Sequence, residues 1–431
     1  MAKSFRSSRS PRGGSSSSSV RHQTSQPSAD VVLGGGHDGG ASGPDANAFS
    51  TRRRRDVFRG GELVVESPRG VPGQERALIE AMPQGAEGRG LVVGSLEGVA
   101  ALALKKLNPA MEVVAHDDDA WEAEATATVL ARHEAAFPVI AHVGGEPPVG
   151  PFEWVLCPFT KRGVADLVRE RVRTSVDWLA AGGKLFAAVD DPRDRFLRDE
   201  LRRAFGVVPH AQPVSGASPG VAYVARRPKE RLINPPASWY PISIREGEET
   251  LLLHGRLGIF CHDRLDEGTR ALLSLMDVGD ARRIVDLGCG AGFLGLMALK
   301  REPEARAVFV DSSCRALDAS RRNAEALGVD GRCVFRLSAH ADRDLEVAGL
   351  FGEADGEGDG ADLVVANPPY YGNYRISEVF LRAAHRLLRR GGRLQLVTKG
   401  REWHRHALHE LFGGSSEETR GGYVIFTAQR R

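Results

Sequence analysis

The 431-residue sequence predicts two α/β domains in tandem, each built on a doubly wound, mostly parallel sheet. Three observations support this prediction. Short apolar runs alternate with amphipathic helical stretches from about residue 60 onward. A polar, proline-rich segment at 226–241 interrupts the alternation, which then starts again. Landmark residues recur in the two halves at equal spacing, which is typical of an internal duplication.

The amino-terminal residues 1–55 are low in complexity and basic, with nine Lys or Arg and three Asp. Such a segment cannot bury enough apolar surface to offset its ordering entropy, so we predict a disordered tail. A solvated tail, an organellar transit peptide and a basic arm that contacts phosphates all stay open as its role. Acidic residues slightly outnumber basic ones in the remainder, which argues against a strongly basic nucleic-acid-binding fold.

The overall composition is that of an ordinary soluble protein, with 42% hydrophobic and 26% charged residues. We find no apolar run long enough for a transmembrane helix. The five cysteines form no CxxC pair, which argues against a disulfide framework and a structural zinc and fits a reducing cytosol. We therefore expect a cytoplasmic protein with no metal site and no membrane partner.

The elements expected in the first domain, placed at 60–227, follow from its apolar runs. Its strands are predicted at 90–95, 111–117, 153–159 and 183–190, with helices at 98–108 and 164–183. Residues 228–244 are assigned to a linker. The second domain, 245–431, has strands predicted at 283–290, 306–313, 332–338, 362–370 and 392–400, with helices between them.

The spacing of landmarks supports the duplication. Gly288 precedes Asp311 by 23 residues, and Gly94 precedes Asp117 by the same interval. A second interval of 29 residues separates Asp362 from Gly391 and Glu153 from Gly182. The first copy differs where a site would lie: Val92 and Leu96 stand opposite Asp286 and Gly290, and Pro158, or Cys157 with a one-residue shift, stands opposite Asn367. We therefore expect a degenerate first domain without a cofactor site, which supports or binds rather than reacts.

The stretch "VDLGCGAGFLGLMAL" (285–299) leads an apolar strand into Asp286, Gly288 and Gly290 and then into a helix. Glycines allow a sharp turn and close approach of a ligand at the carboxyl end of a strand. The loop lacks the Gly-Lys-Ser/Thr of a nucleotide-triphosphate site. Asp311 ends the next strand, where a carboxylate can accept hydrogen bonds from both hydroxyls of a ribose; it could equally cap the following helix.

The stretch "LVVANPPYY" ends an apolar strand in Asn367, Pro368, Pro369 and Tyr370. An exocyclic amine on a planar base is a poor nucleophile because its lone pair is delocalised into the ring. The Asn367 side-chain oxygen and the Pro368 carbonyl can accept both N–H groups and localise that lone pair. Rigid prolines hold the acceptors in place, and Tyr370 offers a face on which a flipped or unpaired base can stack.

These motifs together resemble the class I S-adenosylmethionine-dependent methyltransferases that modify exocyclic or amide nitrogen. The segment "FCHDRLDEGT" (260–269) is similar to the F-x-x-D-x-L-D-x-G-T lead-in of the small-domain methyltransferases. With a degenerate first copy, the chain from about 60 to 431 resembles the bacterial ribosomal RNA guanine-N2 methyltransferases, namely the C-type enzymes that modify small-subunit RNA and their large-subunit relatives. The resemblance implies two tandem Rossmann-like sheets in the methyltransferase fold, of which only the second binds cofactor.

The family pattern implies roles for particular residues. Asp286, Gly288 and Gly290 would line the methionine part of S-adenosylmethionine, and Asp311 would hold its ribose. Ser338 or Ala339, at the end of the strand "CVFRLS", would lie near the adenine. Asn367 to Tyr370 would hold the target guanine in direct, in-line transfer, with Asn367 also beside the cofactor.

The resemblance implies ribosomal RNA or a ribosomal particle as the partner, and we expect a monomer because two fused copies already form a pseudo-dimer. Basic residues at 386–393 and 399–405 are candidates for contacts with RNA. The fourth motif position keeps the acceptor open: Tyr370 stands where the guanine-N2 enzymes usually have Phe, whereas Tyr is commoner in adenine-N6 and glutamine-N5 methyltransferases. A non-catalytic RNA-binding assembly protein is the remaining alternative.

Overall fold

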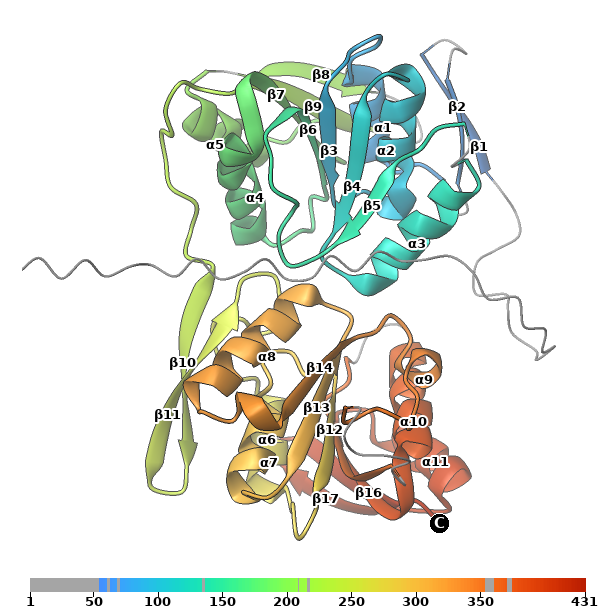
Figure 1. The fold of residues 1–431 in the computed structure, drawn as a ribbon, viewed down its shortest axis with the longest axis vertical. Coiled ribbons are helices and arrows are strands. Elements are labelled where there is room, and N and C mark those ends of the chain that lie inside the picture. Colours follow the sequence, from blue (N-terminus) through green and yellow to red (C-terminus); the bar gives the residue numbers. More distant parts are fainter. Residues whose placement is uncertain are drawn as a thin grey trace, which may run out of the picture. The chain divides into compact units, whose positions relative to one another are not determined.

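The structure is a computed structural model (Figure 1). It describes the following residues: 54–59, 63–67, 70–133, 136–207, 209–214, 218–352, 360–369 and 374–431. The predicted disordered tail, 1–55, lies outside the described residues except for Arg54 and Arg55, which begin the first strand.

Two seven-stranded sheets form the framework, and each with its helices is called a domain below. The first domain contains β1 (Arg54–Phe58), β2 (Leu63–Ser67), α1 (Gly73–Ala81), β3 (Arg89–Val93), α2 (Val99–Leu107), β4 (Glu112–Asp117), α3 (Ala120–Ala131), β5 (Ile140–Val143), β6 (Phe152–Phe159), α4 (Ala165–Trp178), β7 (Leu179–Val189), α5 (Phe196–Phe205), β8 (His210–Val214) and β9 (Gly220–Arg226), with a 3-10 turn η2 (Leu96–Gly98). Strands β10 (Trp239–Glu246) and β11 (Glu249–Arg256) form a separate antiparallel hairpin. This hairpin begins inside the range that the sequence assigned to a linker.

The second domain repeats the same succession of elements. It contains α6 (Glu267–Leu275), β12 (Arg283–Leu287), α7 (Phe293–Arg301), β13 (Arg306–Asp311), α8 (Cys314–Ala326), η3 (Asp330–Arg332), β14 (Cys333–Leu337), α9 (Ala341–Asp344), β15 (Ala361–Ala366), α10 (Arg375–Leu387), β16 (Leu388–Thr398), α11 (Arg401–Phe412), β17 (Ser416–Arg420) and β18 (Tyr423–Gln429). The strands β12 to β16 lie within or close to the apolar runs that predicted them.

The strand orders of the two sheets correspond position by position. They are β5-β4-β3-β6-β7-β9-β8 and β14-β13-β12-β15-β16-β18-β17. In each sheet the first five strands in this order are parallel to one another. The sixth strand pairs antiparallel with the fifth, and the seventh pairs antiparallel with the sixth. The prediction of two tandem doubly wound sheets is therefore confirmed; the two antiparallel strands at one edge of each sheet were not predicted.

Each sheet is covered by helices on both faces, because its buried strands carry apolar side chains in both directions. In β3, Val92 joins a cluster with α1, α2 and α3, whereas Leu91 and Val93 join a cluster with α4 and α5 (Figure 1). In β12, Ile284 and Val285 divide in the same way between α6–α8 and α10–α11.

The landmarks that indicated duplication occupy matching structural positions. The Glu153 carboxylate accepts from the Arg89 N–H at 2.7 Å, and the Asp362 carboxylate accepts from the Arg283 N–H at 2.9 Å. Gly182 and Gly391 have φ angles of 81° and 79°, in the region that favours glycine. Landmarks at equal intervals in the sequence thus make the same hydrogen bond and adopt the same φ region in the two sheets.

Candidate active site

The candidate site lies at the carboxyl edge of the second sheet, where the strand order reverses between β12 and β15. Leu287 of β12 pairs with Val310 of β13 and with Ala366 of β15. Gly288, Asp311 and Asn367 each come directly after one of these paired residues, so the sheet brings the three together. Ligands bind at such a switch point in open α/β sheets.

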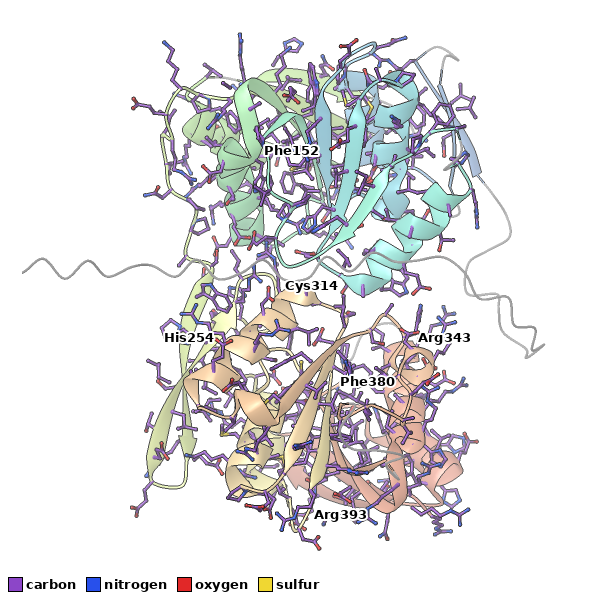
Figure 2. All side chains as sticks on the ribbon, in the orientation of Figure 1. Phe152, His254, Cys314, Arg343, Phe380 and Arg393 are labelled. Carbon is purple, nitrogen blue, oxygen red and sulfur yellow. The ribbon has the colours of Figure 1, made fainter. Side chains whose placement is uncertain are left out.

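Main-chain and side-chain contacts hold the glycine loop, residues 288–292, in place. The N–H groups of Gly288 and Cys289 donate to the Val310 carbonyl at 2.8 and 3.0 Å. Gly288 has a φ of 66°, and a Cβ there would lie 2.6 Å from the Phe380 ring (Figure 2). Any side chain at this position would therefore strain the backbone and displace Phe380.

Gly290 faces open space, since a Cβ built on it would meet no atom within 4 Å. Its N–H donates to Asp311 Oδ2 at 2.9 Å, and its carbonyl accepts from the Ser320 hydroxyl at 2.9 Å. The other Asp311 oxygen accepts from the Ser313 N–H at 2.9 Å. A ligand can thus approach the backbone at Gly290 beside a carboxylate that is already oriented, which fits the ribose and methionine parts of S-adenosylmethionine.

Asp286 lies beneath this loop and is 1% exposed. Its Oδ2 accepts from the Gly295 N–H, in the first turn of α7, at 2.8 Å. Burial raises the pKa of Asp286 from 3.8 to about 8. Asp286 therefore connects β12 to the first turn of α7 through a buried hydrogen bond. The sequence predicted that it lines the methionine part of the cofactor.

The pKa of Asp286 leads to a prediction about stability. The folded protein keeps this proton up to about pH 8, whereas an ordinary carboxyl loses it near 3.8, so unfolding becomes easier as pH rises between these values. Asp286→Asn preserves an acceptor for Gly295 but does not titrate. Without cofactor, the melting temperature of the wild type should fall between about pH 5 and about pH 8. We expect the fall in the variant to be smaller by a few degrees. Parallel profiles in a thermal-shift titration would contradict the buried, protonated state.

Ser338 follows β14, and Asp311 pairs with Leu337 in the register of the two strands. The Ser338 N–H donates to the Asp311 carbonyl at 3.0 Å, and its hydroxyl donates to Asp344 at 3.0 Å. Ser338 is buried. The structure thus brings Ser338 to the same edge, with its side chain held by the short helix α9.

Asn367 is oriented by two residues that the sequence did not assign to the site. Its Nδ2 donates to Asp266 Oδ2 at 2.8 Å and to the Thr269 hydroxyl at 3.0 Å. A carboxylate only accepts hydrogen bonds, so the amide nitrogen must face Asp266 and the amide oxygen must point to the other side. Asp266 also caps α6 by accepting from the Thr269 N–H at 3.0 Å. The D-x-G-T end of the lead-in motif was the sequence signal for this pair.

Pro368 and Pro369 continue the chain beyond Asn367, with Pro368 buried and Pro369 half-buried. Tyr370 lies outside the described residues. The nearby Tyr374 stacks on Trp403 at 4.8 Å between ring centroids. Asn367 and Pro368, the two predicted acceptors, therefore lie at the switch point, and the predicted stacking residue Tyr370 is outside the described residues.

Several residues of the basic stretches predicted to contact RNA are paired with acids. Arg389 pairs with Asp362, and Arg393 pairs with Asp277 at 2.8 Å. Arg401 and Arg405 both contact Glu417. These pairings leave the two stretches with less net positive charge than their sequences indicate.

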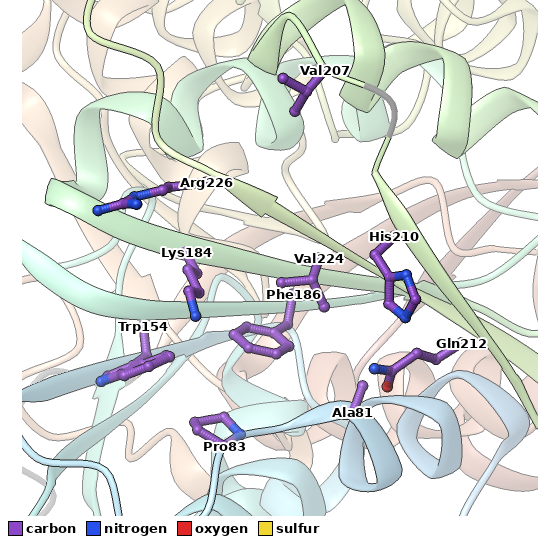
Figure 3. A pocket seen from close by; sticks show the side chains of 10 residues that line it. All are labelled: Ala81, Pro83, Trp154, Lys184, Phe186, Val207, His210, Gln212, Val224 and Arg226. Carbon is purple, nitrogen blue, oxygen red and sulfur yellow. The ribbon is translucent and has the colours of Figure 1, made fainter.

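A cavity of about 560 Å³ lies in the first domain (Figure 3). Its lining combines Trp154 and Phe186 with Lys184 and Arg226. Trp154 pairs with Gly90, near the start of β3, so this cavity is at the amino-terminal half of its sheet. The glycine loop and Asn367 follow the carboxyl ends of strands in the other sheet, which makes this cavity distinct from the candidate active site.

Three further observations concern the residues that the structure describes. Among the residues that the structure describes, no helix combines the length and apolar character needed to cross a membrane. A search of the same residues finds no cluster of three or more potential metal ligands. All five cysteines are free thiols.

Comparisons with known proteins define the class and then the family. Residues 250–427 match the family model described as "Methyltransferase small domain", which identifies the second domain as a methyltransferase domain. It is 30% identical over 312 residues to ribosomal RNA large subunit methyltransferase G of Pseudomonas savastanoi pv. phaseolicola, covering 70% of this chain and 77% of that protein. The chain belongs to the ribosomal RNA large subunit methyltransferase G family.

Other relatives agree with this assignment. The enzyme of the same name from Pseudomonas aeruginosa is 32% identical over 276 residues, which is 62% of this chain and 68% of the relative. The fold matches the T. thermophilus 16S rRNA N2 methyltransferase RsmC, solved in complex with AdoMet and guanosine, with a TM-score of 0.63. That match has 20% identity and covers 89% of this chain and 99% of RsmC, so it shows the two-domain fold. The resemblance to small-domain methyltransferases is confirmed.

Proposed function

We propose that this chain transfers a methyl group from S-adenosylmethionine to the exocyclic N2 amine of a guanine in ribosomal RNA. The observation that carries the proposal is the placement of Asn367 beside the glycine loop, with its amide nitrogen tied to Asp266 at 2.8 Å. Ribosomal RNA as the substrate is supported by the relatives, which are named as ribosomal RNA methyltransferases. Guanine N2 is supported by the duplicated domains and by the motifs described from the sequence.

The proposed mechanism assigns one task to each group of residues. Bound S-adenosylmethionine supplies an electrophilic methyl carbon, attached to a positively charged sulfur. Gly288, Gly290 and Asp311 hold the cofactor. Asn367 Oδ1 and the Pro368 carbonyl accept the two N–H groups of the target amine, which localises its lone pair and fixes its direction. The amine nitrogen would attack the methyl carbon directly, and the methyl–sulfur bond would break to leave a neutral thioether, so no nucleophilic Ser or Cys is required. The proton that the amine loses would leave to water.

An alternative acceptor is supported by Tyr370, which is commoner at this position in the adenine-N6 and glutamine-N5 methyltransferases. The chemistry of Asn367 would be the same, because each acceptor is an amine or amide nitrogen with a delocalised lone pair. A non-catalytic assembly protein is disfavoured by the oriented Asn367 and the open loop at Gly290.

A product analysis tests the proposal. The full chain is incubated with isotopically labelled cofactor and with ribosomal RNA or isolated ribosomal particles, and the RNA is then digested to nucleosides. We expect label in N2-methylguanosine with the wild type and none with Asn367→Ala. Recovery of N6-methyladenosine would replace guanine by adenine as the acceptor, and label on a protein glutamine would remove RNA as the substrate.

We further propose that the protein acts as a cytoplasmic monomer. The five free thiols fit a reducing compartment. The two homologous sheets within one chain provide the pairing that two separate protomers would otherwise supply.

A further inference from the structure

The loops that follow β4 and β13, equivalent strands of the two sheets, are hydrogen-bonded to each other. The Ala120 N–H donates to the Ser312 carbonyl at 2.7 Å, and the Cys314 N–H donates to the Asp118 carbonyl at 2.9 Å. Together they form an antiparallel bridge between Asp119 and Ser313. We call these two loops, 118–120 and 312–314, the loop bridge.

Side chains reinforce the loop bridge. The Ser312 hydroxyl donates to Asp119 Oδ2 at 2.7 Å. The other oxygen of Asp119 caps α3 by accepting from the Trp121 N–H at 2.9 Å, and Ser313 caps α8 by accepting from the Ala316 N–H at 3.3 Å. Helices of the two domains therefore begin on opposite sides of the same bridge.

A buried arginine extends the contact. Arg315, in the first turn of α8, is 5% exposed. It lies 2.7 Å from Glu170 and 3.0 Å from Asp118, both in the first domain. Arg171 adds a second cation to Asp118 at 2.9 Å. Leaving a buried charge without its partner is costly. These pairs therefore restrict the position of Arg315 relative to Asp118 and Glu170.

The loop bridge adjoins the carboxylate proposed to hold the ribose. Asp311 precedes Ser312, and its Oδ1 accepts from the N–H of Ser313, the residue at the centre of the bridge. We propose that the first domain positions Asp311 through the loop bridge, with Asp118 and Asp119 of the first domain and Arg315 of α8 as positioning residues. This inference rests on the assignment of Asp311 as a cofactor-binding residue.

The equivalent acid of the first domain is used differently. Asp117 is 5% exposed, and its carboxylate accepts from the Thr126 hydroxyl of α3 at 3.0 Å. The first copy thus directs its strand-end acid inward and uses the two residues that follow to contact the second copy. The contact gives the first sheet a role in the protein even though that sheet lacks the glycine loop.

The test compares Ser312→Ala and Arg315→Lys with a matched control, all in the full chain. Arg315→Lys keeps the charge and removes the forked geometry. Arg173→Lys makes the same change at a comparable pair, 2.7 Å from Glu200, within the first domain. Three quantities are measured: the dissociation constant of S-adenosylmethionine by calorimetry, the exchange rates of amides 312–314 in the cofactor-free protein, and the melting temperature.

We expect Ser312→Ala and Arg315→Lys each to weaken cofactor binding about 3- to 10-fold and to accelerate exchange at 312–314 by a similar factor. Arg173→Lys should leave both within about twofold, whatever its effect on the melting temperature. Unchanged binding in both loop-bridge variants, while Asp311→Ala abolishes it, would overturn the positioning role and leave the site intact. Unchanged binding in Asp311→Ala would overturn the assignment of the site itself.

Discussion

Replacing Asn367 by alanine is expected to lower kcat for methyl transfer by about 10²- to 10³-fold, while the dissociation constant of the cofactor changes less than about threefold. The variant removes the acceptor that localises the lone pair of the target amine. It keeps the hydrogen bond from the Gly290 N–H to the Asp311 carboxylate, in which Asn367 takes no part. Single-turnover rates and calorimetry on the same preparation measure the two quantities separately.

Asp266→Asn is the companion variant. Asparagine is as good a helix cap as aspartate, so α6 should persist, but the acceptor-only carboxylate that fixes the Asn367 amide is lost. We expect kcat to fall by about tenfold, less than in Asn367→Ala, with cofactor binding unchanged. A parallel loss of cofactor affinity in Asn367→Ala would show that this residue holds the cofactor rather than the acceptor amine.

Replacing Asp311 by alanine is expected to weaken cofactor binding by about 30- to 1000-fold, corresponding to about 2–4 kcal/mol. Two losses combine in this variant. The ribose hydroxyls lose a charged acceptor, and the N–H groups of Gly290 and Ser313 lose the carboxylate to which they donate at 2.9 Å. Calorimetric titration with S-adenosylmethionine measures the change.

The duplication provides a matched control for Asp311. Asp117 ends the equivalent strand of the first sheet and is bonded to Thr126 at 3.0 Å. Asp117→Asn keeps an acceptor for this bond, so we expect cofactor affinity to stay within about twofold of the wild type. An equal loss in both variants would indicate a general loss of folded protein, and melting temperatures would reveal it.

Much of the fold was predictable because it depends on local periodicity. Apolar runs of strand length and the glycines that end them recur at fixed intervals, and these features specify a parallel sheet and its carboxyl edge. The pairing of Leu287 with Ala366 confirms that the glycine loop and Asn367 emerge side by side. The hairpin β10–β11 was missed because its first strand begins in the proline-containing segment that was assigned to a linker, although Ile242 and Ile244 alternate there with exposed residues.

The candidate site was less predictable in its internal contacts. Asp286 was predicted to line the cofactor, and the sequence did not show that its carboxylate is buried and accepts from the Gly295 N–H of α7. Arg389 and Arg393 were predicted as candidates for RNA contacts, and the sequence did not show that they pair with Asp362 and Asp277 in the fold. In both cases the residue type was read correctly and its partner was not visible in the sequence.

The sequence by itself determined the two sheets, the loop at 288–292 and the Asn-Pro-Pro stretch at 367–369, because each is encoded by neighbouring residues. Only the tertiary structure decided which groups orient them. Asp266 reaches Asn367 across 101 residues, and Asp119 reaches Ser312 across 193. Contacts at such separations depend on how helices pack against the finished sheets, and no local pattern of residues records that packing.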